Sequence, residues 1–379
     1  MKKFIDIVRS IKDYIIQYEN IHKLFMMPKK EIKIPKENRS ISKLEKEILY
    51  NENLFKRLRS NFLDEIYDTG GHWKDIYQNL NIINLIKDLI EKDNKFFYEV
   101  ISKPHLSDIH HGFGDITKSL ISSHRYSDFY NNEIIHDCIF RIACSLSLIK
   151  LPEAYHGNKN INLSSEELLD KIFDHLGVKT DFKNTFSMER GIKTKYGLIS
   201  YAPIQQLYQA IKVLEITSKI ENPKVLEIGA GIGFSAYHSW NFGLKNYSIV
   251  DLPLGCISIG FNLSNLIGEN NLLFNNEIKN QNETTEKIKI YNPTNLDNIN
   301  ENFDLITNFD SITEMSKDVA KQYVNFASKK TKYFLSINHE GNSFTVDEIF
   351  RDSSFEKISR NLTWYRQGYI EELFVNKTK

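Results

Sequence analysis

Apolar residues recur at helical spacing along the first half of the chain. Between residues 42 and 50, and again between 81 and 90, they come every three or four positions with polar or charged residues between them, the pattern of an amphipathic helix. A third segment, 164–173, starts with a helix-capping signature, and Gly177 follows where such a helix would end. We therefore predict a mainly α-helical N-terminal region over residues 1–195, which serves as a lid or substrate-binding region or in oligomerisation.

The pattern of apolar positions changes near Tyr196. Residues 201–217 suit one amphipathic helix, and short apolar runs then alternate with helical stretches, which is typical of a parallel sheet with connecting helices. The last two runs, 355–359 and 370–375, have no long helix between them and predict an antiparallel pair at one sheet edge. The fold class expected for residues 196–379 is α/β, with a seven-stranded, mostly parallel, Rossmann-like sheet. Its five predicted parallel strands are 224–228, 247–251, 287–291, 303–308 and 333–338.

The composition is that of an ordinary globular protein. Of the 379 residues, 41% are hydrophobic and 26% are charged, and 49 basic residues balance 49 acidic ones. Because the formal net charge is zero, no overall electric field attracts the chain to nucleic acid. We therefore predict no nucleic-acid partner.

The sequence carries no export or membrane signal that we recognise. Asp6 and Arg9 interrupt any apolar core of a secretion signal. The most apolar long stretch, 134–151, contains Asp137 and Arg141, so it suits a buried helix better than a transmembrane segment. The three cysteines are an odd number without metal-ligand spacing and make a poor disulfide framework. We therefore expect a cytoplasmic location.

A glycine-rich loop carries the first functional prediction. The predicted strand 224–228 is followed at once by Gly229-Ala-Gly-Ile-Gly233, and a helix is predicted from about Phe234. Glycines let the chain turn sharply and let a ligand approach the backbone, and the start of a helix presents free N–H groups. Asp251 lies 22 residues after Gly229, at the end of the next strand, where a carboxylate could accept both hydroxyls of an adenosine ribose. This arrangement predicts a cofactor that contains adenosine.

Two cofactors fit this arrangement, S-adenosyl-L-methionine (SAM) and NAD. The segment from Gly231 to Ala236 also satisfies the G-x-G-x-x-A fingerprint of NAD enzymes, but that register inserts two extra residues between the strand and its first glycine. Glu227 instead matches the E-x-G-x-G-x-G loop of methyltransferases. We therefore predict SAM, with S-adenosyl-L-homocysteine (SAH) as its product. An NAD-dependent sugar-nucleotide oxidoreductase and a glycine-rich turn without a ligand are the alternatives. The residues predicted to bind the cofactor are Glu227, Gly229, Ala230, Gly231, Gly233, Asp251, Leu252 and Asn308.

Five segments of the chain are distinctive, in chain order 225–233, 250–253, 308–315, 334–340 and 366–373. Together they resemble a family of sugar O-methyltransferases from bacterial surface-polysaccharide gene clusters. The resemblance covers roughly residues 195 to 375, and the sequence departs from the family at Ile232, where an aromatic residue is common. It implies a class I SAM-dependent methyltransferase fold and methyl transfer to a hydroxyl of a sugar or glycoconjugate during surface-glycan biosynthesis. A SAM-dependent methyltransferase of another small metabolite is the alternative, and oligomer formation is left open.

Methyl transfer to a hydroxyl requires alignment of the reacting atoms and removal of the hydroxyl proton. His339 follows the predicted strand 333–338 at the carboxyl edge of the sheet, and imidazole accepts a proton near neutral pH. We predict His339 as the base. Asp310 and Glu314 follow the strand 303–308, and each could hold a substrate hydroxyl or orient His339. The plainer explanations are a structural histidine, a turn aspartate and a glutamate at a helix start.

A metal ion is an alternative means of activating the hydroxyl. Asp310, Glu314, His339 and Glu340 could together bind Mg²⁺, which would hold two adjacent sugar hydroxyls and acidify one. Because the spacing does not require it, we predict no metal site and hold the Mg²⁺ mechanism second. A second histidine-rich stretch between residues 105 and 115 lacks metal-ligand spacing and is explained by solvated turns.

Overall fold

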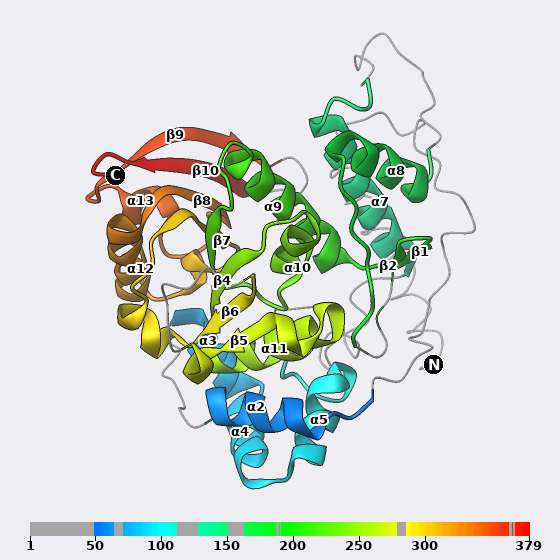
Figure 1. The fold of residues 1–379 in the computed structure, drawn as a ribbon, viewed down its shortest axis with the longest axis vertical. Coiled ribbons are helices and arrows are strands. Elements are labelled where there is room, and N and C mark those ends of the chain that lie inside the picture. The colour runs from blue at the N-terminus through cyan, green and yellow to red at the C-terminus, as the bar shows by residue number, and fades with distance from the viewer. Residues whose placement is uncertain are drawn as a thin grey trace, which may run out of the picture.

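The computed structural model describes residues 49–63, 71–111, 128–150, 163–186, 189, 191–278, 286–363, 366 and 368–379. The elements before the main sheet are α2 (Glu52–Phe62), α3 (Gly71–Asn79), α4 (Ile82–Glu91), α5 (Asn94–Ser102), η2 (Pro104–Leu106), α7 (Asp128–Ser145), α8 (Ser165–Leu176), β1 (Ile192–Thr194), β2 (Gly197–Ile199) and α9 (Tyr201–Thr217) (Figure 1). The first half of the main sheet comprises β3 (Lys224–Ile228), α10 (Phe234–Asn241), β4 (Asn246–Val250), α11 (Pro253–Ile267), η3 (Glu269–Asn271), β5 (Leu272–Phe274), η4 (Asn275–Glu277), β6 (Ile288–Tyr291) and η5 (Pro293–Asn298). The remainder comprises β7 (Phe303–Phe309), η6 (Ile312–Glu314), α12 (Lys317–Lys330), β8 (Thr331–His339), α13 (Val346–Phe350), β9 (Phe355–Leu362) and β10 (Tyr369–Asn376).

The main sheet has the strand order β5-β6-β4-β3-β7-β8-β10-β9. Strands β3 to β8 pair in parallel, and β10 runs antiparallel between β8 and β9. The five predicted parallel strands and the antiparallel pair are therefore confirmed. The predicted number of seven strands is wrong, because β5 adds an eighth strand at the edge beside β6. With only three residues between two 3₁₀ turns, β5 is too short to show a periodic apolar pattern.

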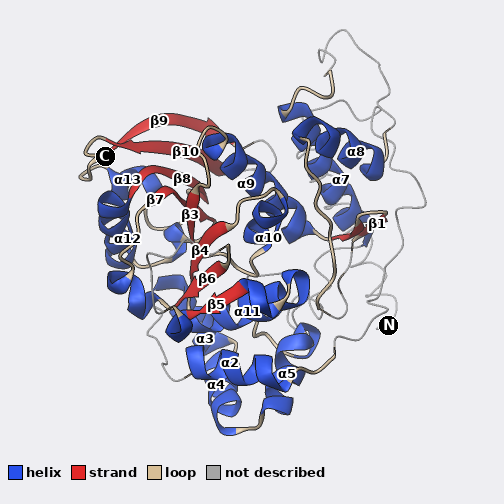
Figure 2. Cartoon of the chain, viewed as in Figure 1, coloured by secondary structure: helices blue, strands red, loops and turns tan. Residues whose placement is uncertain are grey.

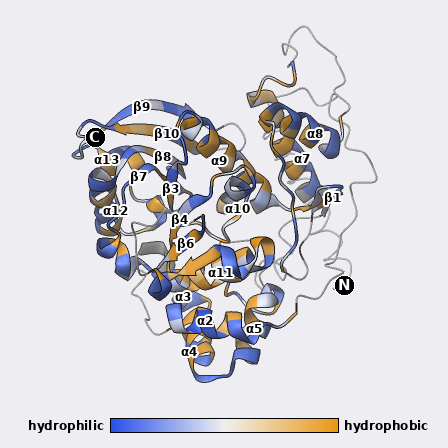
Figure 3. Cartoon of the chain, viewed as in Figure 1, coloured by the Kyte–Doolittle hydropathy of each residue, from blue (hydrophilic) through white to orange (hydrophobic). Residues whose placement is uncertain are grey.

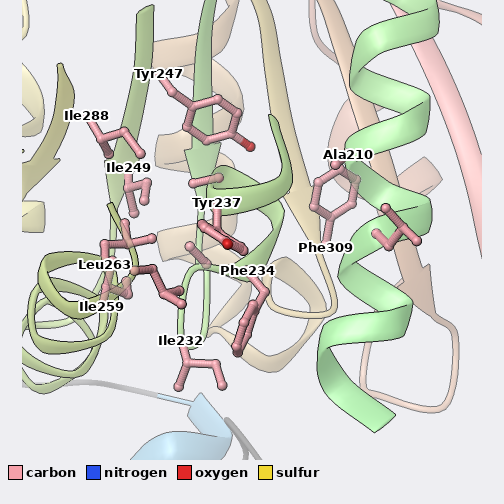
Figure 4. Close-up of a cluster of buried hydrophobic side chains, with 14 of the residues drawn as sticks. Ala210, Ile232, Phe234, Tyr237, Tyr247, Ile249, Ile259, Leu263, Ile288 and Phe309 are labelled. Carbon is pink, nitrogen blue, oxygen red and sulfur yellow. The ribbon is translucent and has the colours of Figure 1, made fainter. Parts of the chain in front are cut away.

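The central strands are apolar because helices cover both faces of the sheet (Figure 2). Successive side chains of a strand point to opposite faces. Val225 accordingly joins the core beneath α9, α10 and α11, whereas Leu226 joins the core beneath α12 and α13. Figure 3 shows β5, β6 and α11 mostly hydrophobic and the edge strand β9 mostly hydrophilic. In Figure 4, Phe309 of β7 points toward Ala210 of α9 within the first of these cores.

The N-terminal helices share this core. Phe55 of α2 packs against Phe261 of α11, with ring centroids 5.9 Å apart. Phe62 of α2 packs against Phe274 of β5 at 5.7 Å, and both helix residues belong to the same buried cluster as β3 and β4. The predicted boundary between residues 195 and 196 falls in the turn between β1 and β2, which pair with each other. A division of the chain at this boundary stays a prediction.

Several local predictions in the N-terminal region are confirmed. Ser164 and Glu167 form the predicted capping box of α8, and Gly177 ends that helix at a φ of +67°. The helix predicted over 81–90 is α4. Most of the segment 42–50 lies outside the described residues. No helix in the described part of the chain is long and apolar enough to cross a membrane.

Candidate active site

The glycine loop has the backbone geometry that its sequence predicts. Gly229, Gly231 and Gly233 adopt φ values of +74°, +62° and +81°, in the left-handed region that glycine tolerates best. A Cβ atom on Gly229 would collide with Ser311 Oγ, so this turn also packs closely against the loop after β7. Helix α10 begins at Phe234, as predicted. The turn itself uses several of the loop's backbone donors: Gly229 N–H bonds to the Val250 carbonyl, Ala230 N–H to Asp251, and Gly233 N–H to the Ala230 carbonyl. The start of α10 adds the N–H groups that the first turn of a helix leaves without an intrahelical partner.

Asp251 connects the end of β4 to the glycine loop. Its Oδ2 accepts the N–H of Ala230 at 2.7 Å, and its Oδ1 accepts the N–H of Leu252 at 2.7 Å. Burial raises the pKa of Asp251 to about 7, and these backbone donors oppose that shift. The structure thus brings three of the predicted cofactor residues into direct contact.

Glu227 lies beneath the loop and is 1% exposed. Tyr247 donates a hydrogen bond from its hydroxyl to Glu227 Oε2 at 3.0 Å. The pKa of Glu227 is raised to about 8, mainly by burial; the Tyr247 hydrogen bond opposes this shift and the charge of Asp251 contributes to it. Glu227 is therefore mostly neutral at pH 7 and supports the loop from within the core. Its predicted contact with the cofactor stays a prediction.

The structure gives Asn308 a different role from the predicted contact with SAM. Its side chain is fully buried and donates to the Ile228 carbonyl at 2.7 Å and to Ser311 Oγ at 2.7 Å. Its Oδ1 accepts bonds from Ile312 N at 3.0 Å and from Asn338 Nδ2 at 2.9 Å. An amide offers two donors and two acceptor sites, so none is left for a ligand. Asn308 instead joins the carboxyl ends of β3, β7 and β8.

The predicted catalytic residues do lie together at the carboxyl edge. His339 ends β8, Asp310 follows β7, and His339 Nε2 is 3.9 Å from Asp310 Oδ1. The His339 and Asp310 side chains are 26% and 28% exposed, so both remain reachable from solvent. Gly341 donates its N–H to His339 Nδ1 at 3.2 Å. Because Nδ1 accepts this bond, the proton of the neutral imidazole resides on Nε2, toward Asp310.

Asp310 is held in place by two residues near the start of β10. Arg366 contacts its Oδ2 at 2.7 Å, and the Tyr369 hydroxyl donates to its Oδ1 at 2.6 Å. The Arg366 guanidinium also lies 4.0 Å from the centre of the Tyr369 ring. These contacts hold Asp310 in a left-handed conformation with a φ of +54°, which is uncommon for a residue other than glycine.

Gln205 of α9 extends this network. Its Oε1 accepts a bond from Arg366 at 3.3 Å, while its Nε2 finds no hydrogen-bond partner among the described residues. The residue is 7% exposed. A buried polar group without a partner costs about 1–3 kcal/mol, and because Gln205 Nε2 is fully enclosed it offers no surface to a ligand.

The Mg²⁺ alternative finds part of its predicted ligand set together. One ligand atom each from Asp310, Glu314 and His339 lies within 4.8 Å of the others. Glu340 does not join them, because its carboxylate binds Arg360 at 2.8 Å. Both oxygens of Asp310 are already engaged by Arg366 and Tyr369. A metal ion would have to compete with the Arg366 charge, so we assign no metal site.

Arg366, Tyr369 and Gln205 were not predicted from the sequence as residues of this site. Arg366 and Tyr369 lie within the segment 366–373 that carries the family resemblance, which could have identified them. Gln205 gave no signal, because one polar residue in an amphipathic helix is unremarkable. In the histidine-rich stretch the prediction of solvated turns is wrong for His110, which is buried: its Nε2 donates to the Ile101 carbonyl at 2.9 Å, and burial lowers its pKa to about 4. Asp115 lies outside the described residues.

The strand order and the two loops define the class of fold. A parallel sheet carries a glycine loop after its central strand and an acid after the neighbouring strand, and an antiparallel strand is inserted next to its edge. This is the class I methyltransferase fold, with β5 as an additional edge strand.

Known proteins that are similar to this chain were found among solved structures alone, each over less than half of this chain. No protein-family model matches the chain, and no curated protein matches it. Among solved structures it is similar to the CcbJ methyltransferase from Streptomyces caelestis, at 9% identity and a TM-score of 0.36, over 45% of this chain and 89% of that chain. It is similar to magnesium protoporphyrin IX methyltransferase from Synechocystis PCC 6803 with bound SAH, at 9% identity and a TM-score of 0.34, over 46% and 83% of the two chains. A third is the glycopeptide N-methyltransferase MtfA complexed with SAM, at 11% identity and a TM-score of 0.35, over 45% and 93%. The fold assignment rests on the strand order of this chain.

Proposed function

We propose that the protein is a SAM-dependent O-methyltransferase. The observation that carries this proposal is the pair of hydrogen bonds that the Asp251 carboxylate accepts, from Ala230 of the glycine loop and from Leu252. They lie at the carboxyl edge of a methyltransferase-type sheet. The loop also favours SAM over NAD. Gly229 follows β3 directly, and Gly229, Gly231 and Gly233 all have positive φ. The NAD register would leave Gly229 and Ala230 as two extra residues between the end of β3 and its first glycine, Gly231.

The residues present fit the cofactor by their chemistry. The N–H groups at the start of α10 suit the carboxylate of the amino-acid end, and Asp251, which already accepts backbone N–H bonds from the loop, keeps acceptor capacity for a ribose hydroxyl. The segment that begins with Asn292 and η5 follows β6 and would flank the adenine. When bound, SAM supplies an electrophilic methyl group: the acceptor oxygen forms a bond to the methyl carbon, the carbon–sulfur bond breaks, and SAH leaves as a neutral thioether.

The remaining task of the chain is to position the acceptor and take its proton. We assign to His339 the role of the base that accepts the proton of the acceptor hydroxyl, because the structure places this histidine beside Asp310 at the carboxyl edge. The bond from Gly341 holds the free imidazole with its proton on Nε2. A base needs a lone pair on the nitrogen that faces the hydroxyl. His339 can act as a base at Nε2 only if the Gly341 N–H bond to Nδ1 breaks when the acceptor binds, because the ring proton can then move to Nδ1 and leave a lone pair on Nε2.

A sugar hydroxyl is the acceptor that we propose, in surface-glycan biosynthesis in the cytoplasm. The carboxylate of Asp310 can accept, and the Nε2 atom of His339 can donate, hydrogen bonds to neighbouring hydroxyls, because both side chains are partly exposed. The segment resemblance supports the same choice. A SAM-dependent methyltransferase of another small metabolite remains the alternative, and oligomer formation stays an open prediction.

The first test is titration calorimetry with SAH, with NAD⁺ as the competing ligand. We expect SAH to bind and NAD⁺ not to bind. Binding of NAD⁺ in place of SAH would overturn the proposed loop register and the function with it.

The role of His339 is tested by a pair of variants. If it is the base, His339→Ala and His339→Gln both lower kcat by about 10²–10⁴-fold, and SAH affinity is unchanged. Because glutamine keeps a hydrogen-bond donor, an active His339→Gln variant beside an inactive His339→Ala variant would show that this residue only positions the acceptor. The measurement is methyl transfer from labelled SAM to a panel of sugar nucleotides and methyl glycosides.

A further inference from the structure

Helix α10 begins without a capping side chain of its own. Its N-cap residue is Gly233, which has no side chain that could accept a hydrogen bond from the first turn. The N–H of Ser235, in that first turn, instead donates to Oε1 of Gln206 at 3.2 Å. Gln206 belongs to α9, which packs along α10 (Figure 1). Because the N–H groups of a first turn point out of the helix along its axis, the Gln206 amide lies just beyond the start of α10.

The bond to Ser235 also determines how the Gln206 amide is oriented. A backbone N–H can only donate, so the amide atom that it contacts is the oxygen. The Nε2 of Gln206 then carries two N–H donors that make no hydrogen bond to the residues that the structure describes. Gln206 is partly exposed, and its Nε2, unlike that of Gln205, is not enclosed by the protein. A ligand can therefore reach this donor.

We propose that Gln206 is a cofactor-binding residue, whose Nε2 donates a hydrogen bond to the carboxylate of the amino-acid end of SAM or SAH. This inference rests on the proposed function, which places that carboxylate at the start of α10. There the Gln206 amide uses one donor, the Ser235 N–H, and presents its own N–H groups in return. A hydrogen bond to an ionised carboxylate is stronger than one between neutral groups, so this contact should contribute clearly to cofactor affinity.

Helix α9 also contacts the acceptor side of the site. Gln205, the residue before Gln206, accepts a bond from Arg366 at 3.3 Å, and Arg366 in turn contacts Asp310 at 2.7 Å. Two consecutive residues of one helix therefore contact the cofactor side and the acceptor side. With Gln206 bound to the cofactor, α9 would hold the amino-acid end of SAM at a fixed distance from Asp310.

The plainer explanation is that Gln206 only caps α10. A capping residue affects stability and treats every ligand of the site alike. A residue that binds the carboxylate affects only those ligands that have one. The compound 5′-methylthioadenosine (MTA) separates the two explanations, because it contains the adenosine and the sulfur of SAH but lacks the amino-acid end.

The experiment is titration calorimetry of the full chain with SAH and with MTA, using wild type, Gln206→Glu and Gln206→Ala. Glutamate still accepts the Ser235 bond, and its charge is favourable at a helix start, so Gln206→Glu should resist urea at least as well as wild type. It has no donor, however, and would repel the carboxylate. We expect the Kd for SAH to rise about 10-fold or more in both variants, and the Kd for MTA to stay within about 2-fold of wild type.

Gln322→Glu is the matched control, because it adds the same charge at an exposed position of α12. It should bind SAH as wild type does. Wild-type affinity for SAH in Gln206→Ala, or equal weakening of SAH and MTA in the two Gln206 variants, would overturn the inference and leave the proposed function standing. Failure of the wild-type protein to bind SAH would overturn both.

Discussion

Glu227 shows how a single buried carboxyl can make the stability of this protein depend on pH. Its pKa is about 8 in the folded protein, against an ordinary value of 4.5. Between these two pH values the folded protein keeps a proton that the unfolded chain has released. The contribution of Glu227 to the free energy of unfolding is therefore complete below pH 4.5 and falls by roughly 1 kcal/mol for each pH unit up to about pH 8.

Glu227→Gln should remove this contribution, because glutamine is neutral at every pH and still accepts the Tyr247 hydrogen bond through its Oε1. We expect urea unfolding at pH 6, 7 and 8 to show a smaller loss of stability with rising pH in the variant than in wild type. The exposed Glu356→Gln serves as the control and should keep the wild-type dependence. Equal slopes in Glu227→Gln and wild type would mean that Glu227 is already ionised in the folded protein.

At the scale of the element, the strand, loop and helix from Lys224 to Asn241 depend on the absence of a side chain at Gly229. Gly229→Ala and Gly243→Ala both place a Cβ at a positive φ, +74° and +94°. At Gly229 the Cβ also collides with Ser311, whereas at Gly243 no atom lies within 4 Å. Gly243→Ala should therefore lose about 1–2 kcal/mol of stability from backbone strain alone.

Gly229→Ala should lose clearly more than that, and its affinity for SAH should fall sharply because the loop must shift. Urea unfolding and SAH titration of both variants check this. An equal loss of stability in the two variants would show that Ser311 moves away from the new Cβ atom without a measurable loss of stability.

Elements with a strong local signal could be predicted from the sequence. The helix 201–217 matches α9, and the strand 224–228 matches β3 to the residue, since each has a clear apolar pattern bounded by breakers. Short β5 had no such pattern, and its place in the sheet depends on packing against β6. In the same way, those parts of the candidate site that have no local sequence pattern could not be predicted.

The glycine loop and Asp251 are local features of the sequence, so their meeting could be predicted. The full use of the Asn308 amide and the free Nε2 of Gln205 could not, because each depends on contacts between segments distant in the chain.

At the scale of the whole molecule, the helices before α9 complete the core of the sheet. Phe261 and Phe274 are covered by Phe55 and Phe62 of α2. A chain that starts at residue 196 would expose these aromatic side chains to water, as well as splitting the β1–β2 pair.

We therefore expect residues 196–379, produced alone, to bind the dye ANS and to unfold without a cooperative transition. The full chain should not bind ANS and should unfold cooperatively. Circular dichroism and ANS fluorescence during thermal unfolding are the measurements. Cooperative unfolding of the fragment, with the SAH affinity of the full chain, would establish a separate methyltransferase domain.

Helix α2 also determines how the sheet ends beside β5. Arg57 lies against this strand, with its guanidinium 3.5 Å from the Leu272 carbonyl and 2.8 Å from Glu277 Oε2, and Asn61 accepts a bond from Asn276 N at 2.8 Å. An uncovered edge strand can pair with a strand of another molecule, and the Leu272-Leu-Phe274 segment is apolar enough to do so. Conditions that detach α2 would therefore promote aggregation through β5, and the protein's tendency to form intermolecular β-sheet should depend on a helix some 210 residues earlier in the chain.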